Sequence, residues 1–207
     1  MKMKKLLIIA FFATGVFALN ALHAAEKPVT KKGVLAGFSS NNIGGGDNEI
    51  LGASPDARNH VAIGGYMVQK LRSDLKLRLD ILLTQKGGSY DYDGNKMNIN
   101  LTYLQEDVLA LYKLPLPIKQ SVYLMGGGSV AVNLLSSAEV VVNGESDSTD
   151  MSDSTNTFDV GLVIGAGIEA TDQIFVDARY NFSLLSFDSG NADMTNNGFF
   201  LTAGYTF

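Results

Sequence analysis

The sequence predicts an all-β fold, an eight-stranded antiparallel up-and-down transmembrane β-barrel with short periplasmic turns and long extracellular loops. Three observations support this fold class: a C-terminal segment with two contrasting faces, an N-terminal export signal, and strand-length segments joined alternately by long and short connections. In a barrel of this kind, each strand directs apolar side chains toward lipid and polar side chains toward the lumen.

The C-terminal segment Phe199–Phe207 alternates with period two, as a β-strand between two environments does. Its more apolar face includes Leu201, Ala203, Tyr205 and Phe207. A final aromatic residue preceded by alternating apolar residues resembles the C-terminal assembly signal of bacterial outer-membrane barrels. We expect these four residues to form such a signal and to engage the outer-membrane assembly machinery. The alternative is the last strand of a soluble sandwich.

The N-terminal residues 1–24 predict a cleaved secretory signal peptide. A short segment with three lysines precedes an apolar stretch over residues 6–19, and small residues follow. The preferred cleavage site follows Ala24, with Ala25 as the alternative, so we expect residues 25–207 to form the outer-membrane barrel.

The composition of the mature chain excludes several function classes. Removing the signal leaves 207 − 24 = 183 residues with a formal charge of 13 − 21 = −8, which argues against nucleic acid as a partner. The absence of cysteine excludes disulfides and thiol chemistry. No mature segment approaches the ~20 apolar residues of a membrane helix, so strands would have to cross the membrane.

Eight segments have the length and composition of strands. They are Gly33–Ser40, His60–Leu71, Leu75–Lys86, Asn98–Leu114, Gln120–Leu134, Phe158–Ala170, Ile174–Ser186 and Gly198–Phe207. The connections between them are 19, 3, 11, 5, 23, 3 and 11 residues long. This alternation is typical of a barrel that has both termini on its short-turn side.

Three of these segments alternate apolar residues with charged or small ones, most clearly in Leu75–Lys86. Because eight strands enclose only enough room for side chains, we expect the polar face to fill the lumen and its charges to pair with one another. The predicted lumen charges are Lys76, Arg78, Asp80, Asp159, Glu169, Asp177 and Arg179. A filled lumen implies very low ion conductance.

The segment Asn98–Leu114 changes phase, because its apolar residues fall on odd positions first and on even positions later. A β-bulge near Gln105–Asp107 would restore the alternation. Aromatic residues of several strands are expected in the two interfacial girdles, although aromatics are common in any sheet. The candidates are Tyr103, Tyr112, Tyr123, Tyr180, Tyr205 and Phe207, and the last two fit best.

Two connections have acidic residues that would suit a cation. Asp91–Asn95 resembles the start of a calcium loop, but its glycine comes too early and Thr102 stands where the last glutamate belongs, so a hairpin turn is the better interpretation. Glu145–Asp153 is expected to be a solvated, mobile loop tip. Binding of divalent ions by its carboxylates is the alternative. We therefore predict no metal site and no cofactor.

Several segments together resemble the small outer-membrane β-barrel domain common in Bacteroidetes-type bacteria and often labelled "porin family". The matching segments are Gly33–Phe38, Leu77–Gly87, Tyr103–Lys113, Asp159–Glu169 and Asp177–Asn181. This resemblance implies an eight-stranded outer-membrane barrel and no defined activity. Within the third segment the chain departs from the family, which usually has an aliphatic residue and a proline where Glu106 and Asp107 stand.

We expect a non-enzymatic protein of the cell outer membrane with a structural or interaction role through its extracellular loops. Its expected surroundings are the lipid bilayer and lipopolysaccharide, and we expect a monomer. The alternatives are a narrow porin or channel for small solutes and a soluble periplasmic ligand-binding barrel. A further alternative is a lipid hydrolase that uses His60, the single mature histidine, with Ser39 or Ser40.

Overall fold

The computed structural model describes residues 30–50, 52–142, 144–190 and 192–207, so the predicted signal peptide lies outside the described residues. Nine antiparallel strands form one sheet. They are β1 (Thr30–Gly44), β2 (Asp56–Lys70), β3 (Leu75–Tyr92), β4 (Asn95–Lys113), β5 (Ser121–Val142), β6 (Glu145–Asp150), β7 (Phe158–Glu169), β8 (Ile174–Ser183) and β9 (Thr195–Thr206).

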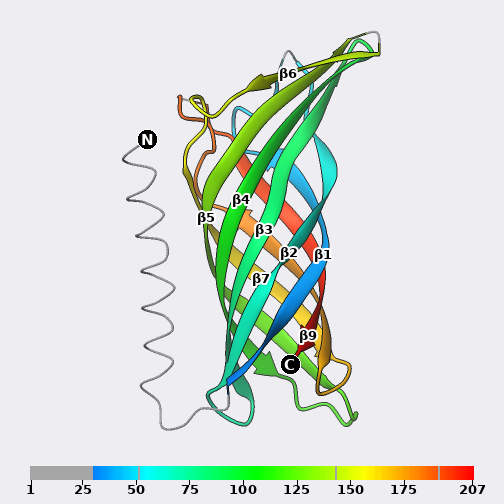
Figure 1. The fold of residues 1–207 in the computed structure, drawn as a ribbon, viewed down its shortest axis with the longest axis vertical. Helices are drawn as coiled ribbons and strands as arrows, with labels where there is room; N and C mark the ends of the chain where they lie inside the picture. The colour runs from blue at the N-terminus through cyan, green and yellow to red at the C-terminus, as the bar shows by residue number, and fades with distance from the viewer. Residues whose placement is uncertain (1–29, 51, 143, 191) are drawn as a thin grey trace.

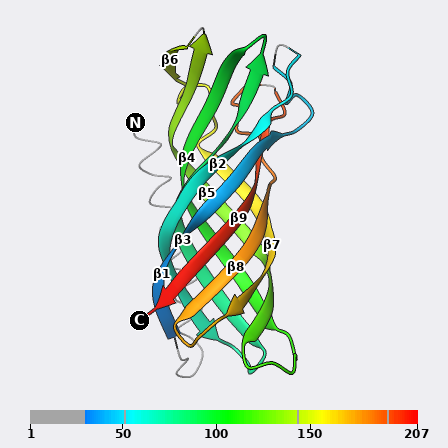
Figure 2. The same cartoon turned by 90° about the vertical axis from the view of Figure 1, so that its right-hand side faces the viewer.

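Eight of these strands close into a barrel. The order β4-β3-β2-β1-β9-β8-β7-β5 returns to its start because β4 also pairs with β5. The first and last strands lie side by side, with a register that runs from Gly33 opposite Thr206 to Gly44 opposite Thr195 (Figures 1 and 2). The predicted eight-stranded up-and-down barrel is confirmed.

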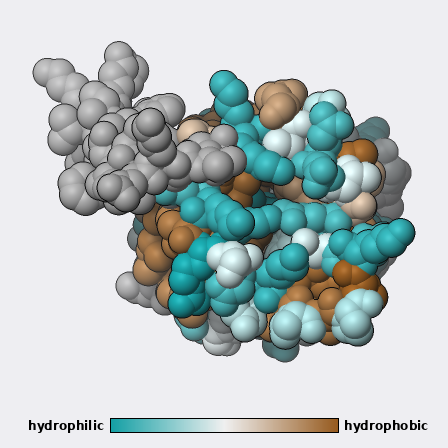
Figure 3. All heavy atoms as spheres, turned by 90° about the horizontal axis from the view of Figure 1, so that it is seen from below, coloured by the Kyte–Doolittle hydropathy of each residue, from teal (hydrophilic) through white to brown (hydrophobic). Residues whose placement is uncertain are grey.

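The alternation of each strand separates an apolar outside from a polar inside. On β3, Ile81 and Leu83 are 40% and 43% exposed, whereas Arg78 and Asp80 are 2% and 0% exposed. A sheet closed on itself hides only its inner face, so the buried charges lie inside the barrel. Seen from the end opposite β6, hydrophilic residues cover much of the barrel end and hydrophobic residues lie along its flanks (Figure 3).

The strands β3 and β4 continue well beyond the predicted segments. A two-residue turn, Asp93–Gly94, replaces the predicted connection of 11 residues, with Tyr92 opposite Asn95. Both turn residues have positive φ, 49° and 78°, which is the geometry that suits a tight hairpin. The predicted alternation of loop lengths is therefore wrong at this hairpin, because polar residues extend the ladder above the membrane.

The acidic segment Glu145–Asp153 was expected to be a mobile loop, and that expectation is wrong for its first six residues. They form β6, which pairs with the upper part of β5 from Val142 opposite Glu145 to Ser137 opposite Asp150. Every residue of β6 is exposed, so this strand is held by the backbone ladder and has no apolar face. Alternating hydrophobicity gives no signal for such a strand.

The predicted β-bulge near Gln105–Asp107 is wrong. The register between β3 and β4 is continuous, and the irregularity with β5 falls where Thr102 faces Leu135 and Tyr103 faces Asn133. Odd-numbered residues of β4 point inward along its whole length, the apolar Ile99, Leu101 and Tyr103 included. The change in pattern arises because the lumen is apolar near the extracellular end, while the outer face there is polar.

An apolar cluster packs inside the barrel near the extracellular end. It is built from Ile43, Tyr90, Ile99, Leu101, Tyr103, Ala131, Phe187 and Met194. Tyr103 and Tyr123 are only 0% and 4% exposed, so their placement in the girdles is wrong. Tyr205 and Phe207 are 44% and 72% exposed on the outer face, as a girdle requires.

Candidate functional site: a charge network in the barrel lumen

A network of five charged side chains crosses the lumen. From β3, Arg78 Nε lies 3.0 Å from Asp80 Oδ1, and Arg78 Nη2 lies 2.8 Å from Oδ2 of Asp177 on β8. Arg179 Nη1, also on β8, lies 2.7 Å from Asp80 Oδ2 and 3.2 Å from Oδ2 of Asp107 on β4. All five side chains are at most 2% exposed. The two guanidinium groups thus tie β3 and β4 to β8 across the barrel.

Neutral groups add further contacts to this network. The Thr202 hydroxyl donates a hydrogen bond of 2.6 Å to Asp177 Oδ1. The guanidinium of Arg78 lies over the ring of Phe175, with its carbon 4.7 Å from the ring centroid. Because a buried ion is costly unless it is paired and hydrogen-bonded, these contacts explain how the charges are accommodated.

Two further ion pairs lie above and below the central network. Toward the extracellular end, Lys86 Nζ lies 2.9 Å from Asp159 Oδ2, and the hydroxyl of Ser183 donates to the other oxygen of the same carboxylate. Toward the opposite end, Lys76 pairs with Glu169. The lumen therefore has paired charges along much of its length.

All seven predicted lumen charges lie in these contacts, together with two residues that the prediction omitted. Lys86 continues the alternation of Lys76, Arg78 and Asp80, so periodicity alone points to it. Asp107 was placed in a bulge, and only an unbroken register on β4 directs it inward, where Gln105 Nε2 donates a 2.8 Å hydrogen bond to it. The completed set holds four cations and five anions.

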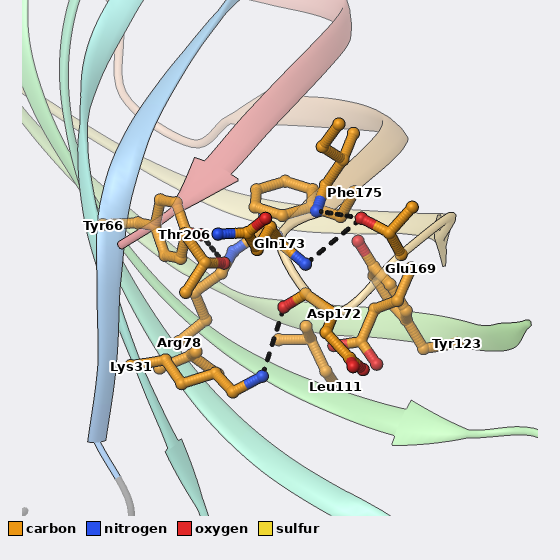
Figure 4. A pocket seen from close by; sticks show the side chains of 13 residues that line it. Lys31, Tyr66, Arg78, Leu111, Tyr123, Glu169, Asp172, Gln173, Phe175 and Thr206 are labelled. Atoms are coloured by element: carbon orange, nitrogen blue, oxygen red, sulfur yellow. Dashed lines mark hydrogen bonds between the residues drawn. The ribbon is translucent and has the colours of Figure 1, made fainter.

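A small cavity lies at the short-turn end of the barrel (Figure 4). The cavity there has a volume of about 20 Å³, room for about one water molecule, and Tyr66, Arg78 and Phe175 are among its lining residues. Tyr66 and Thr206 share a hydrogen bond of 2.5 Å between their hydroxyl groups at its edge. This hydrogen bond joins β2 to β9 beside the cavity.

The hydrolase alternative depends on His60, which lies inside the barrel and is 8% exposed. Ser39 is its register neighbour on β1, yet the Ser39 hydroxyl accepts a 2.8 Å hydrogen bond from Asn41 Nδ2. Within the part of the chain that the structure describes, no hydrogen bond joins His60 to Ser39 or Ser40. The described geometry therefore gives no activated nucleophile.

The described ranges contain neither a metal-binding cluster nor a helix that could span a membrane. Among residues 30–50, 52–142, 144–190 and 192–207, no group of three or more His, Cys, Asp or Glu side chains is placed to hold a metal ion. No helix in the same ranges has the length and hydropathy to cross a membrane.

The proposed assembly residues lie together on the outer face of β9. Leu201 and Tyr205 are 48% and 44% exposed, and Ala203 lies between them opposite Ala36 of β1. The backbone N–H of Phe207 donates a 3.0 Å hydrogen bond to the carbonyl of Lys32, so the terminal residue is held at the barrel seam.

A family model described as an outer membrane protein beta-barrel domain matches residues 31–189. The chain belongs to this family. Membership places the protein in the outer membrane, where the short turns of such barrels face the periplasm and the longer loops face outward. The match does not bear on the expected Bacteroidetes origin.

Solved structures of small outer-membrane barrels are similar to this member of the family. The attachment invasion locus protein Ail of Yersinia pestis, crystallised with the heparin analogue sucrose octasulfate, is 14% identical over 86% of this chain and 99% of its own, with a TM-score of 0.48. Neisserial surface protein A is 14% identical over 85% and 97%, with a TM-score of 0.48. Outer membrane protein W of E. coli is 12% identical over 84% and 97%, with a TM-score of 0.42. No curated protein matches the chain.

Proposed function

We propose that this outer-membrane barrel is non-enzymatic, that its lumen is closed by its own side chains, and that its role is structural or interactive through its extracellular end. One observation carries the proposal: Arg78 and Arg179 bridge three aspartates across the lumen, from β3 and β4 to β8. An ion could pass only by separating these buried pairs, which leaves uncompensated charges in a confined space.

Planar-bilayer recording of the purified full-length mature protein tests the closed lumen. We expect no stable unit conductance, while a general porin inserted from the same detergent produces clear steps. The fold of the inserted protein is checked by its mobility on an unboiled gel. A reproducible unit conductance would contradict the proposal and favour the narrow channel.

The extracellular end has a strongly acidic surface, which supports an interaction role. Among the described residues at this end, only Arg58 and Lys96 supply positive charge outside the lumen. The acidic residues at this end are Asp47, Glu49, Asp56, Asp91, Asp93, Glu139, Glu145, Asp147, Asp150, Asp153, Asp188 and Asp193. This negative charge favours a cationic partner or divalent ions that bridge to lipopolysaccharide. It disfavours a polyanion such as the heparin analogue bound to Ail. Retention of the protein on heparin at physiological salt would contradict it.

The domain organisation forms part of the same proposal. Residues 1–24 are removed on export and residues 25–207 make up the mature outer-membrane barrel, which predicts an intact mass that begins at Ala25. Ser39, the register neighbour of His60, accepts its described hydrogen bond from Asn41. We expect the parent protein and His60→Ala to show the same background activity on phospholipid substrates.

A further inference from the structure

Glu106 lies on the lipid-facing side of β4. It is directly opposite Ile81 on β3 and Val130 on β5, which are 40% and 37% exposed on the outer face. Six residues separate it from Tyr112 at the periplasmic end of the strand. At about 3.3 Å per residue and about 45° of tilt, Glu106 is about 14 Å from that interface, near the middle of the hydrocarbon core.

The carboxyl of Glu106 has no partner within the described part of the chain. No hydrogen bond or ion pair reaches it there, and its neighbours across the ladder and along the strand, Ile81, Val130, Leu104 and Val108, are all apolar. The side chain is 6% exposed. An ionisable residue within a membrane is costly and normally has a partner.

Two glycines make the outer surface flat beside Glu106. Gly126 and Gly128 of β5 face outward, opposite Ala110 and Val108 of β4. A Cβ at either glycine would come no closer than 3.9 Å and 3.7 Å to any other residue's atoms, so the barrel itself does not require glycine there. Gly127 between them is different, because a Cβ there would lie 1.9 Å from the carbonyl oxygen of Val108. Small residues inside a membrane allow another protein surface to come close.

We propose that the outer face of β4 and β5 around Glu106, Gly126 and Gly128 is a dimer interface that binds a second copy of this chain within the membrane. This goes beyond the proposed function, since it concerns the lipid-facing side and holds whether or not the lumen conducts. It replaces the monomer expected from the sequence.

The chemistry of a carboxyl favours a second copy as the occupant. A neutral carboxyl group has one donor and one acceptor, so two of them across a twofold axis satisfy each other without help from another residue type. In an isologous contact the same patch serves both subunits, and a flat patch that contains its own polar group is complementary to itself.

Cysteine cross-linking in outer-membrane vesicles tests the interface, since the chain has no cysteine of its own. Val108→Cys places a thiol on the proposed face, and Val176→Cys on β8 is a matched control with nearly the same exposure, 37% against 38%. We expect Val108→Cys to form at least several-fold more disulfide-linked dimer than Val176→Cys after mild oxidation. Equal cross-linking at the two positions would overturn the proposal.

Second substitutions in the Val108→Cys background separate the interface from the fold. Gly128→Leu is expected to reduce the dimer several-fold, whereas Gly65→Leu is expected to leave it unchanged, because Gly65 also faces lipid with nothing closer than 3.5 Å to its Cβ position. Glu106→Leu is expected to weaken the dimer and Glu106→Gln to retain it. An unchanged dimer in Gly128→Leu or Glu106→Leu, with each variant shown to be folded by its gel mobility, would overturn the roles assigned here.

Discussion

The buried arginines of the lumen act as links between strands that are distant in the ring. Arg179 is the clearest case, because its guanidinium contacts two carboxylates, Asp80 and Asp107, on two other strands. Such a group is held in place by charge balance. Its removal leaves Asp107 without its guanidinium partner and leaves Asp80 paired with Arg78 alone.

Arg179→Ala is therefore expected to destabilise the barrel by about 3–5 kcal/mol, the cost typical of breaking a buried pair. The midpoint of urea unfolding in detergent or lipid vesicles measures this change. Arg72→Ala is the control, because the ion pair between Arg72 and Asp74 at 3.4 Å is exposed and should contribute less than about 1 kcal/mol. Similar losses of unfolding free energy in the two variants would show that the buried network does not stabilise the barrel more than an exposed ion pair does.

Individual residues show where sequence patterns succeed and where they fail. The charges of β3 were predictable, because strict alternation with leucines gives one face to Lys76, Arg78 and Asp80. Tyr103 was placed outside because an aromatic in a membrane barrel suggests a girdle, yet its ring lies inside with Lys86 Nζ 5.2 Å from the ring centroid. Apolar clusters line the lumen at Tyr103 and again at Leu109 and Leu111, so a rule that assigns only polar residues to the lumen misplaces them.

Strand β5 depends on one glycine for its pairing with β4. A side chain at Gly127 would overlap the Val108 carbonyl oxygen, whereas a Cβ at the adjacent Gly126 would come no closer than 3.9 Å to the nearest atom, the Val163 carbonyl oxygen. Gly127→Ala is thus expected to cost about 1–3 kcal/mol or to prevent closure, as an added methyl group in a packed site does. Gly126→Ala should stay within about 0.5 kcal/mol. Unfolding midpoints of the two variants provide the comparison, and equal values would refute the steric argument.

Strand β9 is expected to act in assembly through its terminal aromatic residue. We expect Phe207→Ala to lower the amount of folded protein in the outer-membrane fraction several-fold, because the proposed assembly signal ends on this aromatic residue. Phe182→Ala on β8 removes a ring of the outer face that is 42% exposed and serves as the control. Immunoblots of unboiled membrane fractions measure both, and equal accumulation would count against an assembly signal at Phe207.

Elements differ in how much the sequence reveals of them. The central parts of β3, β7 and β8 were predicted because their apolar faces must contact lipid, which imposes a period of two. The extensions of β3, β4 and β5 and the whole of β6 lie above the membrane, where neither face has to be apolar. Backbone hydrogen bonds hold these segments in the sheet. Such bonds require no particular amino-acid pattern, so the sequence does not reveal these segments.

The closed sheet predicts the behaviour of the whole molecule on a denaturing gel. An unboiled sample from the outer-membrane fraction should migrate as a compact band that shifts on heating, because every strand of the ring is paired on both sides. The same sample without a shift, or recovery of the protein in the soluble fraction, would contradict a closed membrane barrel.

The pairing of β1 with β9 sets the order of events in time. The seam joins residues from opposite ends of the chain, so it cannot form until the last residues have been delivered, and contacts of such long sequence separation are slow to make. Until then both seam edges expose unpaired backbone groups. The sheet therefore stays open at this seam until β9 pairs with β1, which makes that pairing the event that closes the barrel.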